Sequence, residues 1–433
     1  HDLEQPRGAL VRREGRERPR VERDALDRQA VERLDPRRLR MELDAVLLDL
    51  EVEIGGRRLK GVVVEKKAAE EKYEDAVAAG DAAVMLETIE PGLYTMNVGN
   101  LLPLETAKIT FSYAILYRWA GDRLRFFLPT TIAPRFGESH HLPHQVPEAS
   151  LTVENQFSLR IEIHGSLRNA QFICPSHAIE LEKAPEKVVL SLLQPKAVMD
   201  RDFILNGKAP QATRSFALCG QDGDGLAAVA SFQPFFPGLQ QPRPLNLAIV
   251  IDCSGSMQGD SMEQAKQALE EILDALQPHD RITLIAFGNS TSALSDRPLA
   301  CNKTNLTKAK RFAKALDANM GGTEIGKALR EAYSIVGEAE SADIFLVTDG
   351  EVSEWVSVVD EAKESRNRIF TVGVGSAVSE AFVRQLAADT GGECELVSPR
   401  EGMADRVVRH FERMRAPRAK NVVVRWPEGA KHI

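Results

Sequence analysis

The hydrophobic pattern changes character near the middle of the chain. Before about residue 240, apolar and polar residues alternate in short runs such as "VLLDLEVEI" and "LRIEIHG". This pattern predicts strands with one buried face. After Pro242, strands that are apolar along their whole length alternate with amphipathic helical stretches. Strands buried on both faces and joined by helices are typical of a parallel, doubly wound, Rossmann-like α/β sheet.

The second half of the chain therefore predicts an α/β domain over residues 241–414. Its strands are "LNLAIVID", "RITLIAFG", "DIFLVTDG" and "RIFTVGVG". Its helices are "SMEQAKQALEEILDAL", "NLTKAKRFAKALD", "TEIGKALREAYSIV", "VVDEAKESR", "SEAFVRQLAAD" and "MADRVVRHFERMR". A strand pattern, "KNVVVRWPEG", follows the last helix, so we interpret residues 415–433 as the start of a returning strand that the sequence cuts short.

The first half predicts two regions rich in β-structure. In residues 43–140 a hairpin is expected at Gly55-Gly56, and a helix over "KKAAEEKYEDAVAAG" is expected to end at Gly80, because glycine is a common C-terminal cap. Residues 141–240 carry strand patterns at intervals of about a dozen residues, which favours an antiparallel β-sandwich. We assign Tyr73 and the aromatic residues Trp119, Phe126 and Phe127 to the core.

The leader, residues 1–42, is rich in Arg and other charged residues and nearly lacks aromatic and β-branched ones. Such a segment cannot bury enough apolar surface to offset its ordering entropy, so we expect it to be disordered or loosely helical.

Composition and charge argue against some classes of function. The 433 residues suffice for two or three domains, and a formal charge of −8 argues against binding nucleic acid through phosphate attraction. No apolar run is long enough to predict a membrane span.

A cluster of His140, His141 and His144 in a Pro-rich loop is interpreted as solvated rather than metal-binding. The scattered cysteines are expected to be free thiols: Cys174, Cys219, Cys253, Cys301 and Cys394.

Polar residues follow the apolar strands of the α/β domain where the strands end. Ligands bind outside the carboxyl ends of parallel strands, so oxygen donors in those loops converge on one crevice. These donors are Asp252, Ser254, Ser256, Thr323 and Asp349. Oxygen donors without His or Cys indicate a hard cation, Mg²⁺, with Ca²⁺ or Mn²⁺ as possible substitutes. Cys253 is expected to point away from the site as a small buried hydrophobe.

The motif D-x-S-x-S, with a later Thr in a Gly-rich loop and an Asp ending a strand, resembles the metal ion-dependent adhesion site of von Willebrand factor type A domains. The resemblance covers residues 244–413 and implies that the hydroxyls of Ser254, Ser256 and Thr323 contact the metal while the aspartates act largely through water. An acidic group of a protein or extracellular-matrix partner would then complete the coordination. The resemblance implies a non-enzymatic, cation-dependent adhesion protein that is secreted or displayed on the cell surface.

Residues 46–137 resemble the VIT domain of inter-alpha-trypsin inhibitor heavy chains and their bacterial surface-protein relatives. The resemblance rests on Tyr73, Ala76, Gly80, Glu87, Pro91, Val98-Gly99-Asn100, Pro103 and Pro134-Arg135. It implies opening strands where the leader lies, and we expect these strands to be missing. It also implies that residues 148–240 and the returning strand resemble a hybrid sandwich into which the type A domain is inserted.

Other readings of the α/β domain have less support. A structural or assembly module of an envelope or intracellular particle remains the alternative, with a metal that only stabilises the fold. The run Gly321 to Lys327 approaches a phosphate-binding loop, but Ala328 stands where that motif needs Ser or Thr. Ser254 and Ser256 lack the G-x-S-x-G context and a nearby histidine of a serine hydrolase. We therefore predict no enzymatic activity.

Overall fold

The computed structural model divides the chain into two compact units, residues 1–232 and 233–433. The residues that the structure describes are 7–12, 37–41, 44–90, 93–102, 104–117, 119, 122–130, 155–208, 216–222, 225–231, 244–337, 342–349, 355–375, 378–397, 401–415, 423 and 425.

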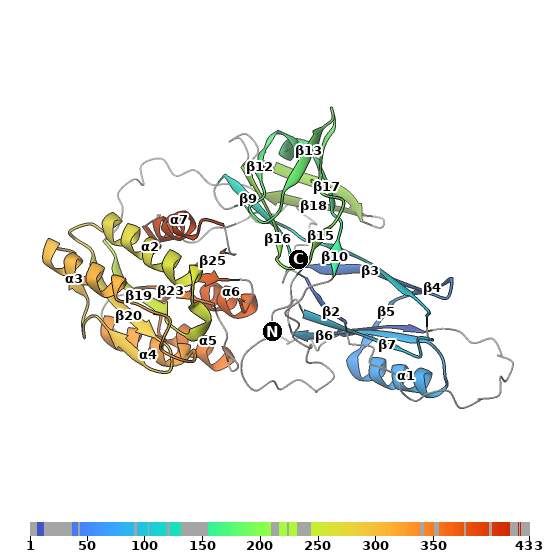
Figure 1. Ribbon diagram of the computed structural model, residues 1–433, viewed down its shortest axis with the longest axis horizontal. Coiled ribbons are helices and arrows are strands. Elements are labelled where there is room, and N and C mark those ends of the chain that lie inside the picture. The colour runs from blue at the N-terminus through green and yellow to red at the C-terminus, as the bar shows by residue number, and fades with distance from the viewer. Residues whose placement is uncertain are drawn as a thin grey trace. The chain divides into compact units, whose positions relative to one another are not determined.

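The second unit is built on the predicted parallel sheet (Figure 1). Its parallel strands are β20 (Arg281–Phe287), β19 (Asn246–Asp252), β23 (Asp343–Thr348), β24 (Arg368–Val374) and β25 (Cys394–Val397), in that spatial order. Two short strands that were not predicted, β21 (Thr291–Ala293) and β22 (Leu299–Ala300), pair antiparallel with β20. The doubly wound α/β prediction is confirmed.

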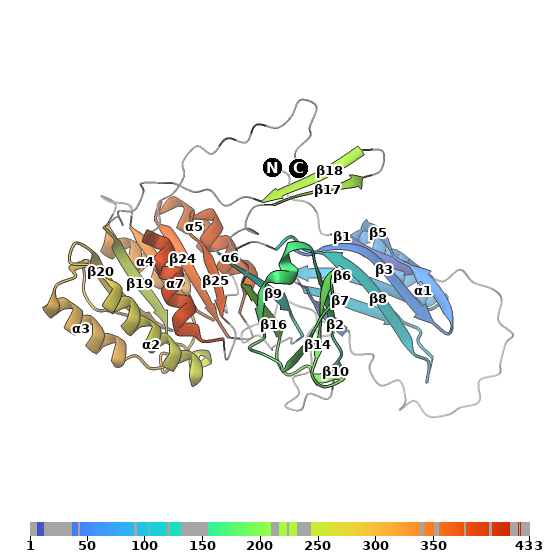
Figure 2. The same cartoon turned by 90° about the horizontal axis from the view of Figure 1, so that it is seen from above.

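Helices cover both faces of this sheet (Figures 1 and 2). One face carries α2 (Asp260–Ala275), α3 (Lys303–Lys314) and α7 (Met403–Arg415). The other carries α4 (Ile325–Val336), α5 (Trp355–Glu364) and α6 (Glu380–Asp389). Along β19, Ile249 and Ile251 pack into the first core while Ala248 and Val250 pack into the second. Successive side chains of a strand point to opposite faces, so a strand covered on both sides is apolar throughout.

The strand order reverses between β19 and β23. The chain leaves β19 through α2 to reach β20 on one side, and later returns to β23 on the other side of β19. The carboxyl ends of β19 and β23 are therefore adjacent at the switch point, where ligands bind in open α/β sheets.

The first unit begins with two sheets and one helix. One sheet has the order β2 (Arg37–Arg40), β7 (Leu93–Gly99), β6 (Ala83–Glu90), β1 (Arg7–Arg12), β5 (Val62–Glu65). The other has the order β4 (Arg57–Lys60), β3 (Val46–Ile54), β8 (Ala107–Ala114), and the helix is α1 (Lys66–Ala78). Val52 of β3 and Val84 of β6 share a buried core. Gly55 and Gly56, with φ of 56° and 76°, form the predicted hairpin turn.

Two strands lie inside the segment predicted to be disordered. Strand β1 pairs antiparallel with both β5 and β6, and β2 pairs with β7. For these ranges the prediction of disorder, and with it the prediction that the opening strands are missing, is wrong. The composition of the whole leader obscured a short strand whose hydrogen-bonding partners lie more than fifty residues further along the chain.

The end of α1 explains several residues of the VIT motif. Gly80 has a φ of 81°, and its N–H donates to the Val77 carbonyl at 3.1 Å while the Asp81 N–H donates to the Ala76 carbonyl at 2.9 Å. This pair of bonds is a Schellman cap. The Asn100 amide adds donations to the carbonyls of Val77 and Asp81 at 2.8 and 3.0 Å. The predicted glycine cap is confirmed, and Asn100, which directly follows β7, ties the cap to the end of that strand.

Gly99 is where this helix end meets β7. A Cβ at this position would lie 2.3 Å from Val77 Cγ2 and 3.2 Å from Tyr73 Oη. We expect Gly99→Ala to lower the free energy of unfolding of the first unit by about 1–3 kcal/mol, because inserted atoms must displace packed ones. Gly220→Ala is the control, because no atom lies within 4 Å of its added Cβ. Equal calorimetric melting temperatures for the two variants would contradict this close approach.

The remaining described strands of the first unit pair antiparallel, as predicted. One sheet has the order β11 (Arg160–His164), β14 (Lys187–Leu192), β13 (Ile179–Lys183), and another β12 (Gln171–Ile173), β16 (Phe203–Lys208), β9 (Arg123–Leu128). The short pairs are β10 (Gln156–Phe157) with β15 (Ala197–Val198) and β17 (Phe216–Asp222) with β18 (Gly225–Ser231). Leu190 of β14 and Phe203 of β16 share a core, into which Phe126 packs. Strand β9, predicted in the first domain, thus belongs to this region.

Several predictions fall outside the described residues. These are the histidine cluster at 140–144, the motif residues Pro91, Pro103, Pro134 and Arg135, and nearly all of the returning strand at 415–433. All five cysteines are free, as predicted. Among the described helices, none is both long and apolar enough to cross a lipid bilayer.

Candidate metal centre

The predicted motif begins at the last residue of β19. Asp252 is fully buried and Ser254 is 1% exposed. A short 3₁₀ turn over Gly255–Met257 then carries Ser256 to the surface. The Oγ atoms of Ser254 and Ser256 are 3.0 Å apart, so the turn brings both hydroxyls to one place.

Hydrogen bonds fix the carboxylate of Asp252. Its Oδ1 accepts from the Ser254 N–H at 2.9 Å, and its Oδ2 accepts from the Thr348 hydroxyl at 2.7 Å. Thr348 ends β23, and the next residue, Asp349, is 8% exposed. Burial, reinforced by the negative charge of Asp349, raises the pKa of Asp252 to about 6. Two acidic side chains are therefore close together in the interior, an arrangement that a cation would relieve.

The loop that carries Thr323 is bound to the serine turn through the backbone. The Met320 N–H donates to the Cys253 carbonyl, and the Gly255 N–H donates to the Gly321 carbonyl, both at 2.9 Å. Thr323 follows two residues later and is half-buried. The structure thus joins the two loops by direct hydrogen bonds, as their predicted convergence requires.

Sequence reasoning missed two residues that hold this loop. The N–H of Asn289 donates to the Met320 carbonyl at 2.8 Å, and its side-chain Oδ1 accepts from the Gly322 N–H at 2.8 Å. A Cβ on Gly288 would lie 2.4 Å from the Met320 carbonyl oxygen, so only glycine permits this approach. A signal existed, because "GN" stands directly after the apolar strand "RITLIAF".

We expect Asn289→Ala to weaken Mg²⁺ binding by about tenfold, because groups that orient metal ligands typically contribute factors of 10 to 100 in affinity. The loss of the Asn289 acceptor leaves Gly322 without its hydrogen bond and loosens the Thr323 loop. Isothermal titration measures the change. Ser290→Ala, an exposed neighbour, is the control. Equal affinities for the two variants would exclude this positioning role.

The donor set fits a hard cation. Three hydroxyls and two carboxylates are the kind of ligand that Mg²⁺, Ca²⁺ and Mn²⁺ prefer. Across the described ranges, no three or more His, Cys, Asp or Glu side chains are grouped to hold a metal ion. Cys253 is 1% exposed and packs in the core with Met257. Burial raises the pKa of its thiol to about 12, so this residue is the predicted small hydrophobe.

A doubly wound sheet with hydroxyl and carboxylate residues gathered at its switch point is the arrangement of the von Willebrand factor type A class. The family model described as von Willebrand factor type A domain matches residues 246–404. The model described as Vault protein inter-alpha-trypsin domain matches residues 38–113. The chain is therefore a VIT plus von Willebrand factor type A domain protein.

Curated relatives share both regions. A von Willebrand factor A domain-containing protein of Dictyostelium discoideum is 25% identical over 394 residues, covering 88% of this chain and 42% of the relative. Human von Willebrand factor A domain-containing protein 5A is 25% identical over 421 residues, covering 89% and 53%. Human Protein mono-ADP-ribosyltransferase PARP4 is 25% identical over 400 residues, covering 89% and 23%. The chain thus spans about half or less of these relatives' length.

Two solved structures are similar to part of the chain. A von Willebrand factor type A protein from Catenulispora acidiphila has 22% sequence identity and a TM-score of 0.36, covering 46% of this chain and 45% of its own. Proximal thread matrix protein 1 from the mussel byssus, in a structure with a zinc-occupied MIDAS motif, has 17% identity and a TM-score of 0.33, covering 38% and 46%.

Proposed function

We propose that the type A domain is a divalent-cation-dependent protein-binding module. The ion would be held by Asp252, Ser254, Ser256, Thr323 and Asp349. Mg²⁺ is the ion that this donor set favours, with Ca²⁺ or Mn²⁺ as substitutes. A carboxylate of a protein or extracellular-matrix partner would complete the coordination, and the protein would be secreted or displayed on the cell surface.

The observation that carries the proposal is the pair of backbone hydrogen bonds between the serine turn and the Gly-rich loop. These bonds bring the loop of Thr323 to the hydroxyls of Ser254 and Ser256. Together with the Thr348 bond to Asp252, they connect loops that are separated by almost a hundred residues, which supports one common site.

The exposure of the site favours partner binding over a purely structural ion. Ser256 is exposed and Thr323 is half-buried, so one side of the donor cluster is open to solvent, while the carboxylates lie beneath it. Hydroxyl ligands leave the charge of an ion largely uncompensated, so an incoming carboxylate gains a strong interaction. An ion that only stabilised the fold would need no such opening.

The same contacts support a non-enzymatic role. A serine nucleophile needs a general base, usually histidine, within hydrogen-bonding distance. In the described part of the chain, the hydroxyl of Ser254 interacts instead with a second serine, Ser256, and with the carboxylate of Asp252. These contacts differ from those of a typical serine nucleophile.

Metal binding is tested by isothermal titration of the chain with Mg²⁺, Mn²⁺, Ca²⁺ and Zn²⁺. We expect one site that Thr323→Ala weakens by at least tenfold, because a hydroxyl ligand is removed. Thr307→Ala is the control, since Thr307 is exposed on α3 and donates only to its own helix, at the Lys303 carbonyl. Equal metal affinity in the two variants would refute the assignment of Thr323.

Partner binding is tested separately by capture on immobilised matrix proteins, with Mg²⁺ or with EDTA. Under this proposal a captured protein is released by EDTA and is not retained by Thr323→Ala. Retention of that partner in EDTA, with metal binding intact in titration, would favour the structural role of the ion instead.

A further inference from the structure

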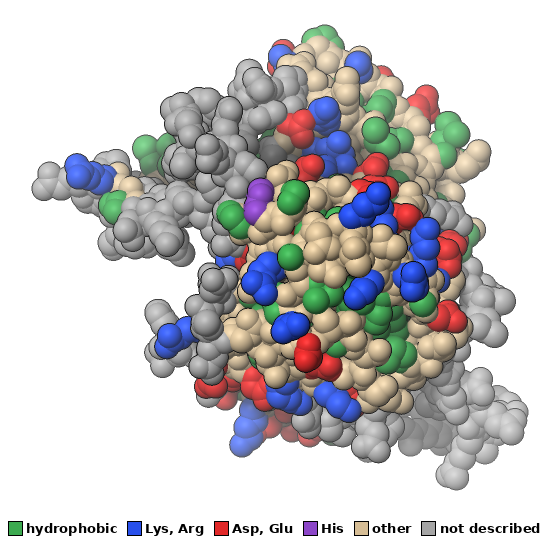
Figure 3. All heavy atoms as spheres, turned by 90° about the vertical axis from the view of Figure 1, so that its left-hand side faces the viewer, with side chains coloured by type: hydrophobic (Ala, Val, Ile, Leu, Met, Phe, Trp, Pro, Cys, Tyr) green, Lys and Arg blue, Asp and Glu red, His purple; other side chains and the backbone are tan. Residues whose placement is uncertain are grey.

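Helix α3 is strongly basic in an acidic chain. Its twelve residues include five Lys or Arg and no Asp or Glu, whereas the chain as a whole has a formal charge of −8. The enrichment extends back to Arg281, since residues 281–314 hold seven basic residues and one acidic residue, Asp296. Figure 3 shows the side of the type A unit where α3 lies, with Lys and Arg side chains spread across its centre. Such asymmetry of charge indicates a binding surface for a partner of opposite charge.

Some of these cations are already paired with α2. Lys310 contacts Asp274, and Lys314 lies 3.5 Å from Glu270. Both pairs are at least partly exposed to solvent, where an ion pair typically contributes less than 1 kcal/mol. A carboxylate from another molecule can therefore replace either acidic partner at little cost.

The other three cations of α3 face solvent. Lys303, Lys308 and Arg311 are exposed, and within the described ranges they make no ion pair. Lys308 and Arg311 are three residues apart and thus neighbours on the helix surface, where like charges weaken a helix. A bound acidic segment would remove this repulsion.

A groove gives such a segment a place to lie. It has a volume of about 470 Å³ and runs between α2 and α3. Its charged lining residues are Lys266, Lys310 and Lys314 together with Glu263 and Glu270. Each of the three lysines is paired with an acidic side chain of α2. The charges of the groove are thus largely paired within the domain, and the exposed cations of α3 beside it, Lys303, Lys308 and Arg311, are the ones that an acidic segment in the groove would meet.

We propose that α3 is a docking surface for an acidic polypeptide segment of a partner protein, independent of the metal. The amino end of α3 follows β22, which pairs with Arg281 and Ile282 at the amino end of β20, whereas the metal centre lies at the carboxyl ends of the strands. A polypeptide fits better than nucleic acid. The one aromatic residue of α3, Phe312, packs against the core, so the surface has no ring on which bases stack.

The test uses the whole chain in EDTA, with a fluorescently labelled poly-L-glutamate peptide of about 20 residues as the probe and anisotropy as the readout. We expect binding that weakens as salt is raised. The triple variant Lys303→Glu, Lys308→Glu, Arg311→Glu should weaken binding by about tenfold or more. The neutral variant Lys303→Gln, Lys308→Gln, Arg311→Gln should fall between it and the wild type.

The control changes the net charge equally at exposed lysines of the first unit, in the variant Lys67→Glu, Lys72→Glu, Lys183→Glu. We expect its affinity to stay within about twofold of wild type, because a local surface rather than total charge binds the probe. Equal losses in the two charge-reversed variants would overturn the proposal. Tighter binding of labelled oligothymidylate or heparin than of poly-L-glutamate, lost in the α3 variant, would overturn the choice of a polypeptide partner. Because EDTA is present throughout, neither result depends on the metal centre.

Discussion

An Asp252→Asn variant is expected to lose at least about a hundredfold in Mg²⁺ affinity, yet to melt no lower than wild type in EDTA. The amide keeps an oxygen that accepts from the Ser254 N–H, and the Thr348 hydroxyl can accept from its nitrogen instead of donating. Shape and hydrogen bonding are therefore retained. The substitution removes one of two neighbouring buried negative charges, of which the other belongs to Asp349. Removing like-charge repulsion stabilises the metal-free fold.

Differential scanning fluorimetry with EDTA or Mg²⁺ measures both effects. Wild type should melt higher with Mg²⁺ than with EDTA, since an ion that binds only the folded state stabilises it. Asp252→Asn should show no such difference. Asp296→Asn, which removes an exposed carboxylate of the same unit, should behave as wild type. If Asp252→Asn responds to Mg²⁺ as wild type does, the carboxylate has no part in metal binding. If it melts lower in EDTA, the role of Asp252 is chiefly structural.

The fold of the type A unit could be predicted because its signal is local. Along β19, residues that are apolar without interruption reflect two cores, one on each face, and each helix has its own amphipathic pattern. Strand β1 gave no comparable signal. Its place is fixed by hydrogen bonds to β5 and β6 rather than by the pattern of its own six residues.

In the candidate site, too, some residues could be found from a local sequence signal, while others depend on contacts with distant parts of the chain. The positions of Asp252 and Asp349 at the ends of β19 and β23 could be predicted, because apolar strands and the polar residues that end them are readable in the sequence. For Asn289 the sequence shows only that "GN" follows the apolar strand. It does not show that Asn289 holds the backbone of Met320 and Gly322, because a backbone group leaves no trace in the identity of its residue. Gly288 is similar, since the need for glycine arises only when the other loop is in place.

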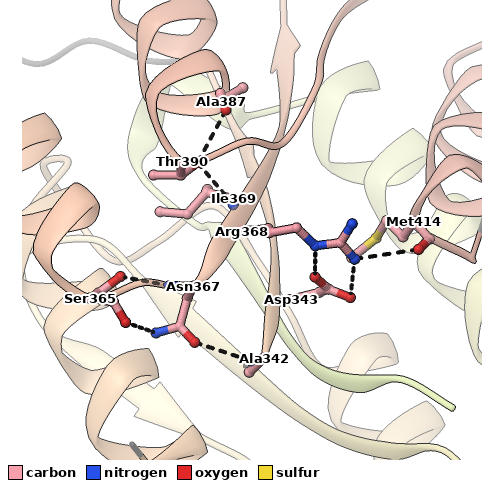
Figure 4. A network of polar contacts seen from close by, with 9 residues as sticks. All are labelled: Ala342, Asp343, Ser365, Asn367, Arg368, Ile369, Ala387, Thr390 and Met414. Carbon is pink, nitrogen blue, oxygen red and sulfur yellow. Dashed lines mark hydrogen bonds and ion pairs between the residues drawn. The ribbon is translucent and has the colours of Figure 1, made fainter. Parts of the chain in front are cut away.

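The second large effect is expected at the opposite end of the sheet, where Arg368→Met should destabilise the type A unit by about 3 kcal/mol or more. Figure 4 shows the Arg368 guanidinium of β24 donating two hydrogen bonds to the Asp343 carboxylate of β23. The two bonds are 2.6 and 2.7 Å long. The Arg368 guanidinium also donates to the Met414 carbonyl of α7 at 3.4 Å. The side chain of Asp343 is 2% exposed, so the variant leaves a buried carboxylate without this cation. Methionine retains most of the apolar length of arginine, which separates the loss of charge from a loss of packing.

The matched control is Arg330→Met, because Arg330 pairs with Glu361 at 2.8 Å on the surface, where the two side chains are 59% and 45% exposed. Water screens that pair, so its loss should cost less than about 1 kcal/mol. The double variant Asp343→Asn, Arg368→Met should recover part of the loss, since it no longer buries a charge. Chemical denaturation of the three variants measures these differences. Equal destabilisation by Arg368→Met and Arg330→Met would mean that the ion pair between Arg368 and Asp343 contributes no more to stability than an ordinary surface ion pair.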